Sequence, residues 1–390
     1  MREIDFSENN LFCRWLGVKS IWSDLERETR HYVKRRLERA MVAEVTSRVG
    51  CARYQRSYAR QGYRNGSYAR DLLTSYGWIE GLEVPRVREG GFVSDVFEKY
   101  HRRQRMVDIV LLEAFLLGHS TRKTRRLFRR LFGSTISAQA VSNIVHELDD
   151  DVQSFHQRVL GDDYQTVYLD GLWVTLSRPV KVKKVLLIAL GVRVDGSKEL
   201  LGFHLAPSES EACWWGFLSD LKHRGLLGMS TIVSDGAAGL VKSIRGLYPR
   251  VGHQLCTFHK AMDLAAHLME KRHRRRIIAD ALHIFDADNQ TQARQRLRRF
   301  AQKWQDREPK AVRCFLREVD ACFVFFQYPP PLWRSLKTSN PIERYIEEIR
   351  RRIIPMRSFN NERSVERIVY GIIAYVIKNN QGMSPNPIYT

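Results

Sequence analysis

The chain lacks any long apolar segment. No run of about 18 apolar residues, the length that a membrane-spanning helix needs, occurs in its 390 residues. We therefore expect no transmembrane helix and no membrane partner. The first ten residues, MREIDFSENN, also lack the apolar core of a signal peptide. Both absences favour a cytoplasmic protein.

Cysteine is scarce and scattered. Six cysteines in 390 residues are too few and too far apart for a disulfide framework. We expect reduced thiols at all of them: Cys13, Cys51, Cys213, Cys256, Cys314 and Cys322.

Acidic residues are under-represented relative to basic ones. Sixty-four Lys and Arg stand against 43 Asp and Glu, a formal charge of +21. Such an excess predicts a polyanionic partner, because a nucleic acid releases its counterions when basic side chains replace them. Hydrophobic residues make up 44% of the chain, which excludes a largely disordered protein.

Turn residues and helical periodicity divide the first part of the chain into three segments. Residues 1–60 are predicted to be a helical, basic region. Residues 61–100 contain short β-like runs separated by Asn-Gly, Tyr-Gly and Gly-Gly pairs, which predicts a small β-hairpin unit. Residues 101–160 show helices separated by glycine-containing turns, with the third helix expected over 137–150. That pattern predicts a helix-turn-helix DNA-binding region.

The predicted helix-turn-helix carries side chains suited to DNA. An ordinary helical hairpin with solvated arginines is the alternative. Basic residues that could meet phosphates, and polar residues that could meet base edges, are Arg122, Lys123, Arg125, Arg126, Arg129, Arg130, Gln139, Ser142 and Asn143.

From residue 161 the pattern becomes α/β. Three strands, the last two joined at Asp195-Gly196, precede a helix–strand–helix–strand series that ends near residue 258. This order is that of a ribonuclease H-like core, since a doubly wound domain alternates from its start. Residues 259–335 read as a helical insertion. Residues 336–378 complete the core, and 379–390 form a loose tail.

Three acidic residues stand out in this core. Asp170 lies in the apolar run VYLDGLWVTL, Asp235 ends STIVSD, and Glu343 begins the helix in TSNPIERYIEEIRRR. Carboxylates held on a rigid sheet bind hard divalent cations such as Mg²⁺. Two such ions can promote a displacement at phosphorus.

Each acid also has a structural explanation. Asp170 with Gly171 could form a tight turn, and Asp235 could cap the following helix. Asn340 and Glu343 could form a capping box with Asn340 as the N-cap. The combination of two strand aspartates and a helical glutamate nevertheless favours a polynucleotidyl transferase.

An ordered series of motifs resembles the Mutator superfamily of DDE transposases, in its bacterial insertion-sequence branch. The matching stretches span roughly residues 60–375 and run from the N-terminal part into the core. They are RNGSYARDLLTSYGWIEGLEVPRVREGGF, GHSTRKTRRLFRRLFG, ISAQAVSNI, YLDGLWV, ALGVRVDGSKELLGFHLAPSESEACWWGFLSDLKHRGL, IVSDGAAGL, QLCTFHK and TSNPIERYIEEIRRR.

The resemblance implies roles for particular residues. Asp170, Asp235 and Glu343 would form the Asp-Asp-Glu triad, which holds two Mg²⁺ (or Mn²⁺) ions per active site. Cys256 and His259 would be the family's Cys-x-x-His element near that site, with structural or DNA-contacting roles. The block 259–335 would be the insertion that precedes the catalytic glutamate.

Alternatives remain for the accompanying residues. Cys256 and His259 could be a buried thiol and a hydrogen-bonded core histidine, or part of a zinc site, although zinc normally has four ligands. The helix of Glu343 also carries basic side chains that could contact DNA or form a solvated face: Arg344, Arg350, Arg351 and Arg352. Trp214, Trp215 and Trp304 are expected in the core.

Together these observations predict a DDE transposase. It would bind the terminal inverted repeats of its element, cleave double-stranded DNA, and join the 3′-hydroxyl to target DNA. Bringing two ends together implies a homodimer or larger oligomer, working at the bacterial nucleoid in the cytoplasm. A metal-dependent nuclease or resolvase of the same fold is one alternative. A catalytically inactive DNA-binding protein of transposase descent is another.

Overall fold

The structure, a computed structural model, describes residues 19–88, 92–96, 102–132, 136–177, 179–356 and 358–380. The chain divides into two compact units: residues 1–115 with 120–144, and residues 116–119 with 145–390. Each unit has a sheet of its own. None of the helices in this described part is long and apolar enough to cross a membrane.

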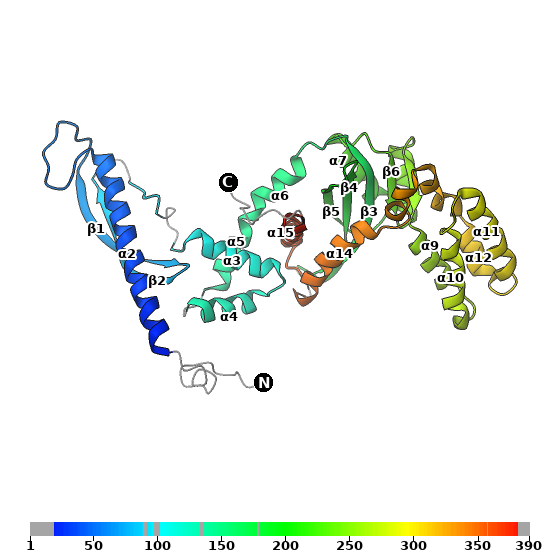
Figure 1. Ribbon diagram of the computed structural model, residues 1–390, viewed down its shortest axis with the longest axis horizontal. Coiled ribbons are helices and arrows are strands. Elements are labelled where there is room, and N and C mark those ends of the chain that lie inside the picture. The colour runs from blue at the N-terminus through cyan, green and yellow to red at the C-terminus, as the bar shows by residue number, and fades with distance from the viewer. Residues whose placement is uncertain are drawn as a thin grey trace. The chain divides into compact units, whose positions relative to one another are not determined.

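A long helix packed on a two-stranded hairpin begins the first unit (Figure 1). Helix α2 spans Lys19–Val49, and strands β1 (Arg64–Thr74) and β2 (Gly77–Val87) are antiparallel. Met41 of α2 is buried against Leu72, Ile79, Leu82 and Val84 of the hairpin. Burial of one apolar face against a helix is what allows a two-stranded sheet to persist.

Three short helices complete the first unit. They are α3 (Arg105–Leu116), α4 (Thr121–Phe132) and α5 (Ala138–His146). The prediction of one continuous helix over 137–150 is wrong, because α5 ends at His146 and α6 (Leu148–Gln157) begins two residues later. The interruption falls beside the division between the two units, which assigns Ile144 to the first and Val145 to the second.

The second unit contains a mixed five-stranded sheet with the order β5-β4-β3-β6-β7. Antiparallel pairing joins β3 to β4 and β4 to β5, whereas β6 and β7 are parallel to β3. Gly196, at φ +81°, forms the predicted turn between β4 and β5. The strands are β3 (Tyr164–Leu176), β4 (Val182–Arg193), β5 (Lys198–Ala206), β6 (Thr231–Ser234) and β7 (Gly252–Leu255).

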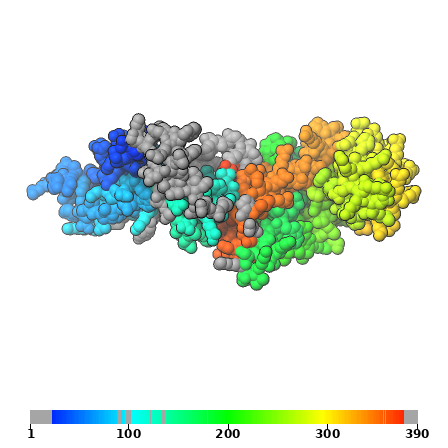
Figure 2. All heavy atoms as spheres, turned by 90° about the horizontal axis from the view of Figure 1, so that it is seen from below, coloured from blue at the N-terminus to red at the C-terminus, as the bar shows by residue number. Residues whose placement is uncertain are grey.

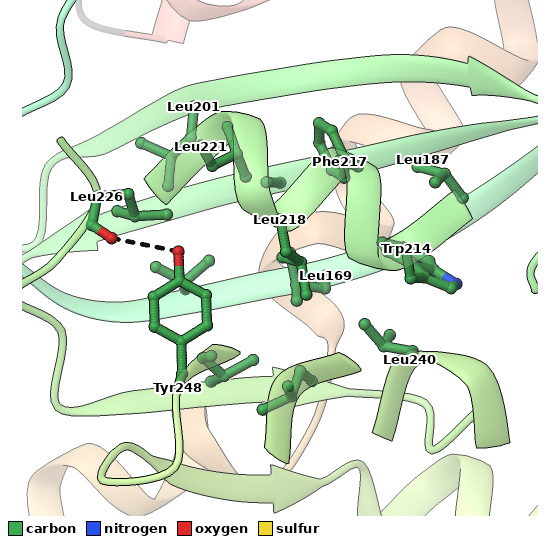
Figure 3. Packing of buried hydrophobic residues seen from close by; sticks show 14 of the residues in the cluster. Leu169, Leu187, Leu201, Trp214, Phe217, Leu218, Leu221, Leu226, Leu240 and Tyr248 are labelled. Carbon is green, nitrogen blue, oxygen red and sulfur yellow. Dashed lines mark hydrogen bonds between the residues drawn. The ribbon is translucent and has the colours of Figure 1, made fainter. Parts of the chain in front are cut away.

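Helices α7 (Glu211–His223) and α8 (Ala238–Leu247) cover one face of this sheet. Alternate residues along each strand point to this face, so Leu169 and Leu187 meet Trp214 in a continuous apolar core (Figure 3). Tyr248 closes one end of that core by donating its hydroxyl hydrogen bond to the carbonyl of Leu226 (3.2 Å).

Helices α14 (Asn340–Ile353) and α15 (Glu362–Asn380) lie on the other side of the sheet. Helix α14 contacts β3, and α15 contacts β5, α14 and α6. Tyr168 precedes Leu169 on β3 and therefore points to this other face, where its hydroxyl donates to the carbonyl of Ser335 (3.0 Å). Phe203 of β5 stacks on a phenyl ring of α6. The sheet is thus the middle of three layers, which is a mixed α/β architecture.

Helices between β7 and α14 gather into one lobe of the second unit, yellow to light orange in Figure 2. Aromatic rings, including Phe285, Phe300 and Phe315, form its interior. Its elements are α9 (Thr257–Ala266), η1 (Lys271–His273), α10 (Arg274–Ile284), α11 (Gln290–Trp304), α12 (Pro309–Leu316), η2 (Val319–Cys322), η3 (Val324–Gln327) and α13 (Pro330–Leu336).

Candidate functional site

Polar side chains lie in one row across three neighbouring strands, in the middle of β3 and just beyond the carboxyl ends of β6 and β7. Leu169 of β3 pairs with Ser234 of β6, and Ser234 pairs with Leu255 of β7. The residues that follow these three along the chain are Asp170, Asp235 and Cys256. Adjacent strands lie about 4.8 Å apart. Parallel pairing thus brings Asp170 and Asp235, which are distant in sequence, to neighbouring positions where β6 ends.

Each aspartate uses one carboxylate oxygen locally. Oδ1 of Asp170 accepts the N–H of Gly171 (2.7 Å), and Oδ1 of Asp235 accepts the N–H of Ala237 (3.0 Å). Asp170 lies within β3 itself, paired with Ile188 of β4, so the interpretation of Asp170-Gly171 as a hairpin turn is wrong. Each aspartate keeps its second oxygen for another partner.

Two helix N-termini bring the remaining residues to this row. Cys256 is the N-cap of α9, and His259 lies in its first turn. Glu343 lies in the first turn of α14. The backbone N–H and hydroxyl of Thr257 both donate to the carbonyl of Lys337 (2.9 and 3.0 Å), which ties the two helix starts together. The last strand of the predicted series, expected to end near residue 258, is correspondingly shorter, because β7 ends at Leu255.

A single buried hydroxyl connects three of these side chains. Ser339 is 0% exposed, and its Oγ lies 2.5 Å from Oε1 of Glu343. The same Oγ lies 3.3 Å from Nδ1 of His259 and 3.4 Å from Sγ of Cys256. A hydroxyl has one proton to donate. The Glu343 carboxylate is the nearest and most strongly charged acceptor, so the Ser339 hydroxyl donates to Glu343.

Ser339, not the predicted Asn340, is the N-cap residue of α14. Its carbonyl accepts the N–H groups of Ile342 and Glu343 (both 3.0 Å), whereas its side chain faces the site. Its role was missed because the sequence Ser-Asn-Pro offers two capping residues and does not show which one is buried against Cys256.

Burial and nearby charge make Asp170 unusually basic. Burial raises its pKa to about 7, and the charges of Asp235 and Glu343 act in the same direction. The Gly171 N–H bond and the charge of His259 oppose that rise. The electrostatic influence of both other acids on Asp170 shows that the structure brings the three predicted acids into one neighbourhood.

His259 supplies positive charge to this neighbourhood. A hydrogen bond to Cys256 raises the pKa of His259 to about 9 against the effect of its burial, and Asp170 and Asp235 add to the rise. Burial disfavours the Cys256 thiolate, but hydrogen bonds with His259 and Ser339 outweigh it and lower the pKa of the thiol. At neutral pH the imidazole is therefore a cation beside several carboxylates.

Glu209 is a further carboxylate that the sequence did not single out. Burial raises its pKa, and the charge of Asp235 raises it further. A Cβ atom added to Gly171 would lie 2.8 Å from its Oε1, so the Glu209 carboxylate lies close against β3 beside Asp170. The stretch SESEA reads as the start of a helix, and nothing in it distinguishes Glu209 from Glu211.

The donor atoms suit a divalent cation. Carboxylate oxygens are the ligands that Mg²⁺ and Mn²⁺ prefer, and the mutual repulsion felt at Asp170 would be relieved by positive charge. Within the described residues, Cys256, His259 and Glu343 are the one set of three whose ligand atoms all lie within 4.8 Å of one another. The three acids do not form such a set, but two ions about 3.5–4 Å apart span a wider group of ligands.

The basic residues of α14 differ in their surroundings. Arg344 and Arg350 are exposed, and Arg351 is exposed but forms an ion pair with Glu348 (2.8 Å). Arg352 is buried and also pairs with Glu348. Its guanidinium therefore holds α14 together and does not face solvent.

In the first unit, all six basic residues predicted on α4 are exposed, namely Arg122, Lys123, Arg125, Arg126, Arg129 and Arg130. Nε of Arg125 nevertheless donates to the carbonyl of Ile136 (2.7 Å), which gives that side chain a structural role. On α5, Gln139 and Asn143 are exposed and hydrogen-bonded to each other (2.8 Å), and Ser142 is half-buried.

Known proteins similar to this chain are transposases. A family described as "Transposase, Mutator family" matches residues 17–381. The transposase for insertion sequence element ISRM5 of Rhizobium meliloti (strain 1021) is 32% identical over 364 residues, 93% of this chain and 91% of that protein. The transposase for IS256 in transposon Tn4001 of Staphylococcus aureus is 31% identical over 337 residues, 85% and 86% of the two chains. Among solved structures, the Drosophila P element transposase strand transfer complex matches with a TM-score of 0.33 and 14% identity, over 74% of this chain and 82% of that one.

Proposed function

The chain belongs to the Mutator family of transposases, and we propose that it is a DDE transposase with a ribonuclease H-like core. Asp170, Asp235 and Glu343 would hold two Mg²⁺ or Mn²⁺ ions. The proposal depends mainly on the parallel register of β3 and β6, which presents Asp170 and Asp235 side by side. The charge of Glu343 also acts on Asp170. The sheet order, an antiparallel meander extended by two parallel strands, supports the core assignment.

The reaction would be two successive displacements at phosphorus. When bound, the two ions activate the attacking oxygen and stabilise the leaving oxygen. The chain's own residues hold and orient the reacting groups: the three acids from the sheet and α14, with Ser339 fixing Glu343. His259, cationic at neutral pH, lies where it can attract the DNA backbone. Exposed Arg344 and Arg350 extend that positive surface along α14.

Water would cut the element end first, and the 3′-hydroxyl so released would attack a target phosphodiester. No covalent enzyme intermediate is required, because positioning and charge neutralisation supply most of the catalysis. The helix-turn-helix of residues 101–160 and the insertion 259–335 would bind the terminal inverted repeats. Joining two ends implies at least a dimer, and a DNA substrate in the chromosome would put the reaction at the bacterial nucleoid.

The test is cleavage and strand transfer by the full chain on duplexes that carry the element's ends, with Mg²⁺. Asp170→Asn, Asp235→Asn and Glu343→Gln should reduce cleavage to background and leave end binding intact. Glu347→Gln is the matched control, because Glu347 is exposed one turn further along α14. It should cut at the wild-type rate.

Other outcomes separate the alternatives. Cleavage without joining would indicate a nuclease or resolvase. Tight end binding by a wild-type chain that does not cut would indicate an inactive DNA-binding protein. A triad variant that cuts at the wild-type rate would remove that residue from the ligand set.

A further inference from the structure

The connection between α2 and β1, residues 50–63, has an unusual composition. No Asp or Glu occurs between Glu44 and Asp71. This connection, the arginine–tyrosine loop, contains three arginines and three tyrosines: Arg53, Tyr54, Arg56, Tyr58, Arg60 and Tyr63. Arginine and tyrosine both donate hydrogen bonds to phosphate oxygens.

The arginine–tyrosine loop has an ordered frame. Gly50, at φ +74°, ends α2, and the N–H of Gln61 returns to donate to the carbonyl of Val49 (2.9 Å). Arg60 donates from Nε to Sγ of Cys51 (3.1 Å) and from its terminal nitrogen to the carbonyl of Gln55 (2.9 Å). Arg60 therefore holds the loop in shape.

The other two arginines of the arginine–tyrosine loop and two of its tyrosines point outward. Arg53 and Arg56 are exposed, and neither has an ion-pair partner in the part of the chain that the structure describes. Tyr54 is 89% exposed and Tyr58 is fully exposed. Both rings, with their hydroxyl groups, are therefore accessible to a partner.

Tyr54 also adopts a backbone conformation that disfavours it. Its φ is +66°, in the left-handed region where a bulky residue is a genuine outlier. Glycine or asparagine would adopt this conformation at lower cost. Residues in such strained conformations cluster at functional positions. The guanidinium of Arg53 lies 5.0 Å from the centre of the Tyr54 ring, which pairs the two exposed side chains.

Beside these residues lies an open hollow of about 520 Å³. Arg56, Arg60 and Tyr63 line it together with Ser57, Gln61 and Gly62. Its lining has hydrogen-bond donors and no acidic side chain, which suits a phosphate group.

We infer that the arginine–tyrosine loop is a second DNA-binding element, which grips the phosphate backbone of duplex DNA through Arg53, Arg56, Tyr54 and Tyr58. This inference rests on the proposed function for the identity of the polyanion. Contacts to phosphate position a protein on the duplex without reading its sequence. The loop should therefore strengthen binding to element ends and to unrelated duplexes alike.

The test is binding of the full chain, as a function of salt, to an element-end duplex, an unrelated duplex and a single strand of equal length. Arg53→Ala/Arg56→Ala should lower affinity for both duplexes by a similar factor. It should also reduce the slope of log K against log salt by about 1.8, about 0.9 for each phosphate. Arg27→Ala/Arg30→Ala changes the charge equally on α2, where both arginines pair with acidic residues, and should have little effect.

Tyr54→Gly gives a readout that a purely structural role would not produce. Relief of the left-handed strain should leave the melting temperature unchanged or raise it, while DNA affinity falls. Tyr76→Ala, at an exposed tyrosine in the β1–β2 turn, is the matched control and should bind DNA like the wild type.

Unchanged duplex affinity in both Tyr54→Gly and the Arg53/Arg56 variant would overturn the inference. A loss confined to the single-stranded probe would also overturn it, because the loop would then bind unpaired DNA. Cleavage by Asp170→Asn at the wild-type rate would instead refute the proposed chemistry, which separates the two failures.

Discussion

Removal of the Ser339 hydroxyl tests how the site holds Glu343. Ser339→Ala deletes the 2.5 Å hydrogen bond to Oε1 of Glu343 and leaves the carboxylate free to rotate. It also removes the hydrogen-bonding contacts from this hydroxyl to His259 and Cys256. The backbone N–H of Ser339, 3.5 Å from the Cys256 sulfur, is unaffected.

The expected loss follows from the nature of that bond. Hydrogen bonds to charged groups contribute about 1.5–3 kcal/mol. Loss of a residue that orients a metal-binding side chain lowers metal affinity about 10–100-fold, or about 1.4–2.8 kcal/mol. The two ranges agree, so Ser339→Ala should raise the Mn²⁺ dissociation constant about 10–100-fold.

Calorimetric titration of the full chain with Mn²⁺ measures this loss independently of catalysis. Ser243→Ala is the matched control, because Ser243 is also 0% exposed and its hydroxyl lies within hydrogen-bond distance of two carbonyls, those of Gly239 on α8 (2.9 Å) and Glu211 on α7 (3.0 Å). Glu343→Gln gives the reference for loss of the ligand itself. Wild-type affinity in Ser339→Ala, with weakened binding in Glu343→Gln, would refute the role of Ser339. An equal loss in Ser243→Ala would assign the effect to general destabilisation.

Three further predictions concern acidity, packing and DNA contact. Folding raises the pKa of Asp170 from 3.8 to about 7. Without metal, the stability of the folded chain should therefore fall as the pH rises from 3.8 to about 7. Melting temperatures in chelator should show this fall in the wild type and less of it in Asp170→Asn. Mn²⁺ affinity should rise over the same interval, because binding displaces a proton. Trp214→Ala should lower the free energy of unfolding by about 3–5 kcal/mol in denaturant titration, whereas Trp215→Ala should cost less, because Trp214 is 1% exposed and Trp215 is 42% exposed. Arg126→Ala should reduce the salt slope of DNA binding by about 0.9 and leave the melting temperature unchanged. Arg125→Ala should also lower the melting temperature, because it removes the hydrogen bond to the carbonyl of Ile136. Equal melting temperatures for these two variants would contradict that distinction.

Local patterns predicted most of the core elements. Apolar runs and the Asp195-Gly196 pair predicted three successive strands, and the structure contains them as an antiparallel meander. The expectation of buried tryptophans is confirmed for Trp214 and Trp304 but is wrong for Trp215, which is exposed. Neighbouring residues on a helix point in different directions, so hydrophobicity alone does not decide which of two tryptophans faces the core.

The amino-acid order was sufficient for the family, for the presence of a mixed α/β fold, and for the selection of Asp170, Asp235 and Glu343 as candidates. Each depends on short-range features: strand and helix periodicity, turn residues, and motifs that occur in a fixed succession. Folding alone decided that Leu169, Ser234 and Leu255 share one register, that Ser339 meets Cys256 and Glu343, and that Glu209 lies beside Gly171. These contacts join segments up to 83 residues apart, and their energies depend on pairs of residues that no local window of sequence contains.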